Sequence, residues 1–322
     1  MISVITPTLN AEKFISKSVE SFLRQDIREE YEVIVVDSSS DKTPDILAKY
    51  PMKVIRQAKL GPAAARNLGV RKSKGNIVVF VDADCLATKS WLRKIVEPFS
   101  GKDVAAVAGA YKVWNKDNLI ARFLQYEIEQ RYEGMRKMDN IDFVGSYNCA
   151  YRKNIFTRFG GFNEKMVQGE DAELSFRVAE EHKIVFQPSA YVYHRHASNL
   201  KDFAKQKFQR GRWKVFLYKQ HGRKVVKNVY TPAGLMLQTL MFAISLLLFG
   251  LSFTFHALFY FSALFMLLSY ALNANLLAFI CKKEPELLPA SLVFIFVRNL
   301  FASFGLIFGT LSLLKCCKIK TI

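Results

Sequence analysis

The sequence lacks the glycine-rich loops with which many nucleotide-binding folds hold phosphate groups. The first apolar segment, Ile2–Thr6, is followed by Pro7 to Asn10 instead of Gly-x-Gly-x-x-Gly, and no Walker P-loop occurs. Both kinds of loop bring backbone N–H groups against a pyrophosphate, so their absence disfavours a nicotinamide cofactor. If this half of the chain binds a nucleotide, a metal ion must hold the diphosphate.

Cysteine is scarce as well. The five cysteines have no metal-ligand spacing and are odd in number: Cys85, Cys149, Cys281, Cys316 and Cys317. This pattern favours reduced thiols in a cytosolic setting over a disulfide framework.

Charge is missing from one long segment. The 50 residues from Thr231 to Ile280 contain no Lys, Arg, Asp or Glu and are rich in Leu and Phe. That length is enough for two membrane helices of about 20 residues each. We expect these helices at about 233–253 and 257–280, with the turn near His256.

A third apolar stretch, 287–314, is interrupted by Arg298 and Asn299. A central arginine costs about 2.5–3.5 kcal/mol on insertion scales, so this stretch either spans a membrane or lies in its interface. We therefore divide the chain into a domain at 1–228 and a membrane domain at 229–322 with two or three hydrophobic helices.

The net charge of +18 suggests nucleic acid, but its distribution argues against such a ligand. Ten Lys or Arg and one acid, Asp202, lie within 201–227, directly before the first apolar stretch. A cluster of this kind fits anionic lipid headgroups and marks the cytoplasmic side. We expect a multi-pass protein of the cell membrane with residues 1–228 in the cytoplasm. The lysines within 315–320 conflict with a third full span, which would place them on the far side.

The first hundred residues alternate apolar runs with amphipathic stretches. The runs are 2–6, 32–36, 52–56 and 77–81, and the stretches between them are 11–24, 43–49 and 62–72. This order predicts parallel β-α-β units in a doubly wound α/β sheet. Ligands bind beyond the carboxyl ends of the strands in such sheets. Asp37 follows the second run, and Asp82 and Asp84 follow the fourth.

Asp82 and Asp84 are candidate metal ligands. They follow Ile77–Val81, whose uncharged β-branched and aromatic residues predict a buried strand. Mg²⁺ or Mn²⁺ takes one or two protein carboxylates and fills its other positions with phosphate oxygens and water. Asp-x-Asp is common, however, and solvated loop aspartates are the alternative.

Several motifs in order along residues 1–215 resemble family 2 glycosyltransferases of the GT-A fold. They are Val33–Asp37 with Ser38, Ser39 and Asp41, then Gly61–Gly69, Phe80–Asp84, Gly160–Asn163, Gly169–Asp171 and Tyr193–His194. The resemblance implies a Rossmann-like nucleotide-diphospho-sugar transferase domain, followed here by an α-helical membrane domain. It also implies an inverting displacement, in which an acceptor oxygen attacks opposite a departing nucleoside diphosphate.

The resemblance implies roles for individual residues. Asp171, paired with Glu170, would be the general base, because the family places this Asp before a Leu and an Arg at fixed spacing. Asp84 and His194 would bind Mn²⁺ or Mg²⁺. The nucleotide-sugar donor would contact Thr6, Pro7, Glu12, Asp37, Gly61, Arg66, Asp82 and Ala83.

Each role has a structural alternative. Asp37 could cap the serine-rich turn that follows it, and Arg66 could form a surface ion pair. The acidic pair at the start of a helix is ordinary, because the helix dipole favours acids there by about 0.3–1 kcal/mol. His194 is expected on a strand with His196 on the same face. Its alternative is a structural role, with the imidazole hydrogen-bonded within the fold.

Gln209, Arg212 and Trp213 match the Gln-x-x-Arg-Trp pattern of processive polysaccharide synthases, in which the acceptor sugar stacks on the Trp. The same stretch resembles a Phe-x-x-Gly-Arg segment of non-processive relatives, and a basic membrane-surface helix is a third interpretation. We expect a membrane-anchored, metal-dependent, inverting enzyme. It would transfer sugar to a lipid-linked acceptor, either a polyprenyl or dolichyl phosphate or a lipid-linked glycan. A processive polysaccharide synthase and a catalytically inactive membrane scaffold are the alternatives.

Overall fold

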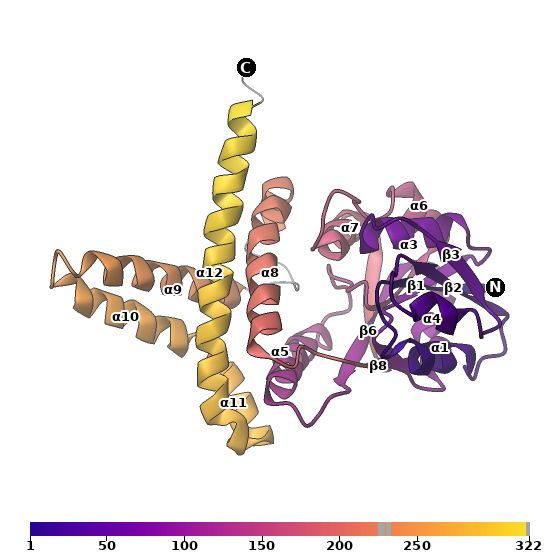
Figure 1. The fold of residues 1–322 in the computed structure, drawn as a ribbon, viewed down its shortest axis with the longest axis horizontal. Helices are drawn as coiled ribbons and strands as arrows, with labels where there is room; N and C mark the ends of the chain where they lie inside the picture. Colours follow the sequence, from indigo (N-terminus) through magenta and orange to yellow (C-terminus); the bar gives the residue numbers. More distant parts are fainter. Residues whose placement is uncertain (225–228, 230–232, 320–322) are drawn as a thin grey trace. The chain divides into compact units, whose positions relative to one another are not determined.

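The computed structural model describes residues 1–224, 229 and 233–319 (Figure 1). The chain forms two compact units. The N-terminal unit comprises Met1–Asn115 and Tyr132–Arg195, and the helical unit comprises Lys116–Arg131 and His196–Ile322. The expected division after residue 228 falls beside a segment outside the described residues, as do Lys227 and Lys320.

The N-terminal unit is built on one mixed eight-stranded sheet with the order β3-β2-β1-β4-β7-β6-β8-β5. Its strands are β1 (Ile2–Thr8), β2 (Tyr31–Asp37), β3 (Lys53–Arg56), β4 (Ile77–Val81), β5 (Cys85–Ala87), β6 (Val104–Val113), β7 (Asn148–Arg152) and β8 (Lys183–His194). The first four strands are parallel, which confirms the units expected from the sequence. Beyond β4 the sheet is mixed, because β7 runs antiparallel to β4 and β6.

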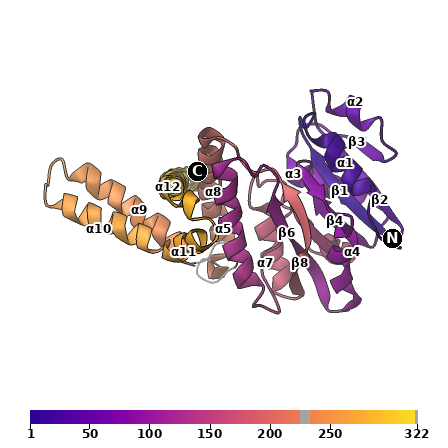
Figure 2. The same ribbon diagram turned by 90° about the horizontal axis from the view of Figure 1, so that it is seen from below.

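Apolar patterning explains the elements of this unit. The helices are α1 (Ile15–Leu23), α2 (Thr43–Leu47), α3 (Pro62–Arg71), α4 (Trp91–Val96), α6 (Lys153–Arg158) and α7 (Glu170–Ala179), with a 3₁₀ turn at Glu97–Ser100 (Figure 2). In α1, Ile15, Val19 and Phe22 recur at helical spacing and are fully buried. The segments Val33–Val36 and Val78–Val81 are buried on both faces of their strands, as parallel sheets require.

Strand register brings the ends of several strands to one edge of the sheet. Thr8 at the end of β1 pairs with Asp37 at the end of β2, and β4 lies on the other side of β1. Cys85, the first residue of β5, pairs with His194, the last residue of β8. The chain therefore delivers Asp37, the Asp82–Asp84 turn and His194 at carboxyl ends of strands.

The helical unit contains the first part of α5 (Leu119–Met135), then α8 (Leu200–Gln220), α9 (Ala233–Leu251), α10 (Leu258–Ala271), α11 (Ala274–Lys283) and α12 (Leu288–Ile319), with 3₁₀ turns at Gly222–Lys224 and Pro285–Leu287. Residues 116–131 lie inside the expected domain 1–228 but pack with the C-terminal helices. The reason is apolar burial, since Phe123 on α5 shares a core with Phe203, Ile280 and Phe294.

Among the described residues, two helical segments are long and apolar enough to cross a membrane, Gly234–Leu251 and Pro285–Leu314, and the bent pair Leu258–Ala271 and Ala274–Lys283 is a third if it forms one span. The expected helix at 257–280 is instead two helices, α10 and α11, bent by 49°. Asn273 lies at this break. Its Nδ2 donates to the Ser269 carbonyl at 2.9 Å, and its Oδ1 accepts from Arg298 at 2.6 Å.

Candidate active site

Asp84 and His194 lie together at the carboxyl edge of the sheet. Asp84 Oδ2 is 3.5 Å from His194 Nε2. Cys85 is the cross-strand partner of His194, and residues paired in this way project side chains to the same face. Ligand atoms of Asp84, Cys85 and His194 all lie within 4.8 Å of one another. The site therefore offers three ligand atoms of different chemistry.

This donor set fits a divalent ion. Two adjacent ligands that each bind an octahedral ion at about 2.1 Å stand about 3.0 Å apart, so Asp84 and His194, whose Oδ2 and Nε2 are 3.5 Å apart, fit such an ion after a small approach. Imidazole suits transition metals, whereas Mg²⁺ prefers oxygen, so His194 favours Mn²⁺ over Mg²⁺. The Asp84 side chain is 39% exposed, which leaves it open to a ligand phosphate.

Cys85 is a candidate ligand that the sequence reading missed. It is fully buried, and burial together with the charge of Asp84 raises the pKa of its thiol. Its place directly after the Asp-x-Asp turn was the available signal.

Arg66, from α3, connects two acidic groups of the site. Its Nη2 donates to Asp82 Oδ1 at 2.7 Å and its Nη1 donates to Glu170 Oε1 at 3.0 Å. The Arg66 side chain is only 5% exposed, so the interpretation as a surface ion pair is wrong. Burial alone would lower the pKa of Arg66, but the two carboxylates raise it, and the guanidinium stays charged. Arg66 thus fixes Asp82 beside the candidate metal ligand Asp84.

Glu170 and Asp171 begin α7. Gly169 precedes them with a φ of +84°, a left-handed conformation that glycine adopts without strain. Burial and the neighbouring Asp171 raise the pKa of Glu170 to about 7, although Arg66 opposes this rise. Burial also raises the pKa of Asp82, against the effect of Arg66.

Asp171 is held by backbone groups. Its Oδ1 accepts from the Ala172 N–H at 2.8 Å, and its Oδ2 accepts from the Ser146 N–H at 3.3 Å. These bonds orient a carboxylate at the start of α7, next to the Glu170 that Arg66 binds.

Asp37 is fully buried, and protein groups contact both of its oxygens. Oδ1 accepts from the Ser39 N–H at 3.0 Å, as in the capping interpretation, while Oδ2 pairs with Arg56 on β3. The Arg56 side chain is 55% exposed and can be displaced by a ligand more easily than a buried cation. A role in donor binding for Asp37 stays a prediction.

The remaining predicted donor residues lie in loops around these strand ends. Thr6 is buried near the end of β1, and its Oγ1 has no hydrogen-bond partner among the described residues. Glu12 lies in the exposed loop before α1, where its Oε2 accepts from the Lys42 N–H at 3.3 Å. Gly61 precedes α3 with a φ of +96°. Pro7 is half-buried in β1, and Ala83 is buried between the two aspartates.

Aromatic rings support His194, and sequence patterns did not reveal them. The Tyr111 ring, on β6, stacks on the His194 imidazole with a centroid separation of 4.4 Å, and Tyr147 stacks on Tyr111 at 3.8 Å. The stack restricts the imidazole to one plane beside Asp84.

The prediction that His194 and His196 share one face of a strand is wrong. The strand β8 ends at His194, and His196 belongs to the helical unit, where its Nε2 lies 3.2 Å from Gln125 Oε1. Gln209, Arg212 and Trp213 also belong to the helical unit, on α8. The Arg212 guanidinium lies 5.9 Å from the Trp213 ring and 5.0 Å from the Phe308 ring.

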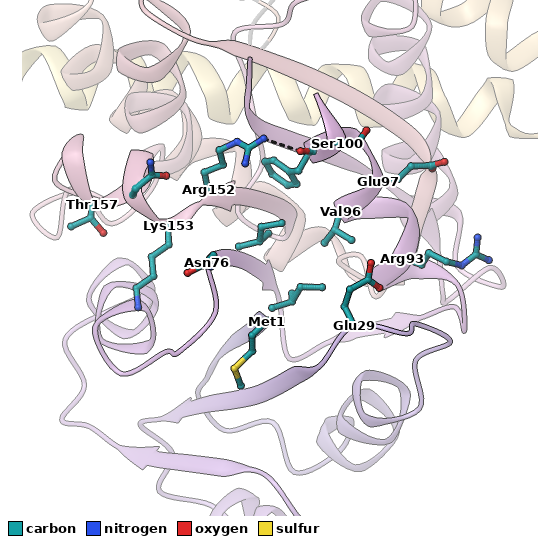
Figure 3. A pocket seen from close by; sticks show the side chains of 14 residues that line it. Met1, Glu29, Asn76, Arg93, Val96, Glu97, Ser100, Arg152, Lys153 and Thr157 are labelled. Carbon is teal, nitrogen blue, oxygen red and sulfur yellow. Dashed lines mark hydrogen bonds between the residues drawn. The ribbon is translucent and has the colours of Figure 1, made fainter. Parts of the chain in front are cut away.

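A separate cavity of about 1200 Å³ lies at the opposite ends of the strands (Figure 3). It is lined by Met1 and Ile2 at the start of β1 and by Asn76 and Ile77 at the start of β4. Arg152, also in its wall, donates to the Phe99 carbonyl at 2.8 Å. None of the predicted site residues lines this cavity, so its size does not mark the candidate active site.

The fold and this site define a class. The sheet is Rossmann-like, an Asp-x-Asp turn lies beside a histidine, and the sequence has no glycine-rich phosphate loop, an arrangement typical of nucleotide-diphosphate sugar domains. Residues 3–160 match the family model "Glycosyl transferase family 2". Residues 3–160 therefore form a family 2 glycosyltransferase domain, of GT-A fold.

Relatives agree with this assignment. The chain is 29% identical over 187 residues to the pre-mycofactocin glycosyltransferase of Mycobacterium tuberculosis, covering 56% of this chain and 40% of that protein. It is 28% identical over 193 residues to glycosyltransferase AglE of Haloferax volcanii, covering 56% of this chain and 61% of that protein. The chain thus spans less than two thirds of the length of either relative.

One solved structure resembles nearly the whole chain. It is the mannosyltransferase PcManGT of Pyrobaculum calidifontis in complex with GDP-Man and Mn²⁺, with a TM-score of 0.62 and 18% identity. The match covers 95% of this chain and 86% of that one. At 18% identity this likeness shows a shared fold alone.

Proposed function

We propose that the chain is a divalent-metal-dependent, inverting glycosyltransferase whose donor is a nucleotide-diphosphate sugar. The observation that carries the proposal is the pairing of Asp84 with His194, 3.5 Å apart, next to the buried Arg66–Asp82 ion pair. A Mn²⁺ or Mg²⁺ ion held by Asp84 and His194 supplies positive charge beside the leaving diphosphate. Binding of Mn²⁺ and GDP-Man by the structural relative supports this choice.

The chain's own groups have distinct tasks in this proposal. Asp82, held by Arg66, faces the donor sugar or ribose. Thr6 offers a buried hydroxyl without a partner among the described residues, suited to a nucleoside, and Asp37 accepts from the nucleobase in place of Arg56. Each of these contacts orients the donor before the reaction.

Asp171 is the proposed general base. It takes the proton from an acceptor hydroxyl as the oxygen attacks the anomeric carbon and the diphosphate leaves from the opposite face. Because burial and Asp171 raise the pKa of Glu170 to about 7, protonation of this neighbour lessens the negative charge beside Asp171.

Donor binding tests the catalytic part of the proposal. UDP-, GDP- and dTDP-sugars are screened for thermal stabilisation of the purified chain with Mn²⁺ and with a chelator. A donor at 100 times its dissociation constant adds about 2.7 kcal/mol to the free energy of unfolding. Stabilisation that needs Mn²⁺ supports the proposal. Lack of stabilisation by every donor favours the inactive scaffold.

We also propose that the acceptor is lipid-linked and that the helical unit attaches the enzyme to the cell membrane, with the catalytic domain in the cytoplasm. Apolar side chains on α9, α10 and their connection support this, since Leu247 is 63%, Phe253 77% and Tyr260 77% exposed. Exposed apolar surface of this extent marks a membrane or protein contact. The basic segment before α9 favours anionic headgroups.

The Asp171→Asn variant distinguishes two acceptor classes. A lipid phosphate is already a nucleophile, so the variant should keep most activity with such an acceptor. A sugar hydroxyl needs a base, so activity with a lipid-linked glycan should fall by about 10²–10⁴-fold.

A processive polysaccharide synthase is the second candidate, because the Gln-x-x-Arg-Trp residues lie on one helix with Trp213 half-buried and 5.2 Å from the Phe216 ring. An assay with donor alone separates the two candidates: polymer indicates the synthase, and a product soluble in organic solvent indicates lipid glycosylation.

A further inference from the structure

The length and apolarity of Pro285–Leu314, which includes most of α12, would allow this segment to span a membrane. The helices that pack against α12 argue against a membrane-spanning position. The helix packs lengthwise against α8 in parallel orientation, and both helices stand upright in Figure 1. Contacts advance together along the two helices, from Phe203 with Phe294 to Arg212 with Phe308.

Glycines bring the two helices into close contact. A Cβ on Gly305 would collide with the Phe208 carbonyl oxygen, one on Gly309 would lie 2.6 Å from the Arg212 carbonyl oxygen, and one on Gly211 would collide with the Ala302 carbonyl oxygen. Small residues at this spacing permit backbones to touch. The contact runs over about 15 residues, or about 22 Å of helix. Any position of α12 in a membrane must therefore hold for α8 as well.

The helix α8 cannot enter hydrocarbon. Between Leu200 and Gln220 it carries seven Lys or Arg and one acid. Each central cation costs about 2.5–3.5 kcal/mol on insertion scales. Lys201, Lys205 and Arg210 are exposed. A spanning α12 would bring these cations into the bilayer core beside it.

Arg298 of α12 is linked to both α5 and α8 through one carboxylate. Its Nη1 donates to Glu127 Oε1 on α5 at 2.5 Å, and the other Glu127 oxygen accepts from Lys207 on α8 at 2.7 Å. Burial alone would raise the pKa of Glu127, but Lys207 and Arg298 lower it to about 2. The carboxylate thus joins α5, α8 and α12 through charge.

The α9–α10 hairpin runs across this pair. In Figure 1 the axes of α9 and α10 run across the upright axis of α12. In Figure 2 α12 is seen end on, and the axes of α9 and α10 still lie in the plane of the picture. The base of the hairpin meets α12, where Phe242 and Phe296 have ring centroids 5.4 Å apart and Ser303 Oγ donates to the Thr239 carbonyl at 3.2 Å. Ser245 and Ser262 join its two helices by hydrogen bonds of 2.9 Å.

We infer that α12 lies flat in the membrane interface together with α8, and that the α9–α10 hairpin crosses the bilayer. This inference rests on the proposed membrane attachment. The 19 residues of α9 measure about 28 Å, close to the 30 Å hydrocarbon core. In this arrangement the cations of α8 meet headgroups, and Val293 and Leu311 of α12, 55% and 54% exposed, meet the acyl boundary. The charged C-terminal segment remains on the side of the catalytic domain, which removes the conflict with a third span.

Reporter fusions to the full chain in cells test the topology. One reporter follows Ile322, and another is inserted between Thr254 and Phe255 at the hairpin tip. The inference predicts a cytoplasmic C-terminus and a tip on the far side. A C-terminus on the far side overturns the flat α12 while membrane attachment stands. A cytoplasmic tip overturns the crossing hairpin, and release of the chain by alkaline wash overturns membrane attachment itself.

Depth measurements with nitroxide labels provide a second readout. Labels at Val293 and Leu311, in a chain whose Cys281, Cys316 and Cys317 are replaced by serine, are 18 positions apart on α12. A flat helix gives both labels the same depth within a few ångström, whereas a spanning helix separates them by about 27 Å. A label at Leu264 on α10, 50% exposed, is the control and should lie deeper than both. Equal depth at Leu264 and the α12 labels contradicts the inference.

Discussion

The Glu170→Gln variant isolates the charge of one buried carboxyl group. In the native site, burial and Asp171 raise the pKa of Glu170 from its ordinary 4.5 to about 7, and Arg66 opposes the rise only in part. Between these two pH values the folded chain binds a proton that the unfolded chain has lost. This extra proton makes the folded state more stable, so the contribution of Glu170 to the free energy of unfolding is complete below pH 4.5 and is lost as the pH rises through about 7.

The magnitude follows from the size of the shift. Each pKa unit corresponds to about 1.4 kcal/mol, so Glu170 lowers the free energy of unfolding by about 3 kcal/mol between pH 4.5 and 8. Glutamine keeps the size of the side chain and an oxygen for Arg66 but does not ionise. Relative to the native chain, the variant should change little at pH 5 and gain up to about 3 kcal/mol at pH 8. For a unit of this size the gain is roughly 6–12 °C in Tm.

Thermal unfolding of the detergent-solubilised full chain from pH 5 to 8.5, followed by tryptophan fluorescence, measures this difference. The control is Glu181→Gln, because Glu181 forms an exposed pair with Arg158 at 2.6 Å. Its effect should stay below about 1 kcal/mol at every pH. Loss of relative stability in Glu170→Gln as the pH rises would mean that attraction to Arg66 outweighs burial, which refutes the reasoning.

Three other substitutions have defined outcomes. Arg66→Gln removes the buried cation between two carboxylates and should lower the free energy of unfolding in urea by about 3–5 kcal/mol. The control Arg71→Gln, on the exposed side of α3, should lower it by less than about 1 kcal/mol. Equal losses in the two variants would contradict the role of burial. Gly305→Ala should lower the free energy of unfolding of the helical unit, measured by its resistance to proteolysis, by about 1–3 kcal/mol. The control Gly250→Ala, which has open space around the new methyl group, should not lower it. Unchanged stability in Gly305→Ala would contradict the close contact. In a chain whose Cys281, Cys316 and Cys317 are serine, Cys85→Ser should abolish the ultraviolet thiolate absorbance that appears on addition of Cd²⁺, and equal absorbance with and without Cys85 would exclude it as a ligand.

Strand periodicity and strand ends could be predicted from the sequence because they depend on local patterns. The Val33–Val36 and Val78–Val81 runs are buried strands, and acids at their ends lie at one edge of the sheet. Asp84 and His194 are 110 residues apart, and only the family resemblance connected them before the β5–β8 pairing did so physically.

Long-range partners could not be predicted in the same way. The sequence marked Arg298 as a costly charge, but its compensating Glu127 lies 171 positions away on α5. Likewise, apolarity alone identifies α12 as a span, because the alternative depends on its packing against α8. His196 was misplaced because β8 ends two residues earlier, which alternation along a strand cannot indicate.

Sugar transfer to lipid is the most direct test of the proposed enzyme. The full chain in lipid vesicles receives Mn²⁺, radiolabelled donor identified by the stabilisation screen, and polyprenyl phosphate or a lipid-linked glycan. The prediction is label in the organic extract, lost with a chelator and in the Asp84→Asn variant. Label that forms polymer, or transfer that persists in Asp84→Asn with chelator present, would contradict a metal-dependent enzyme that glycosylates a lipid.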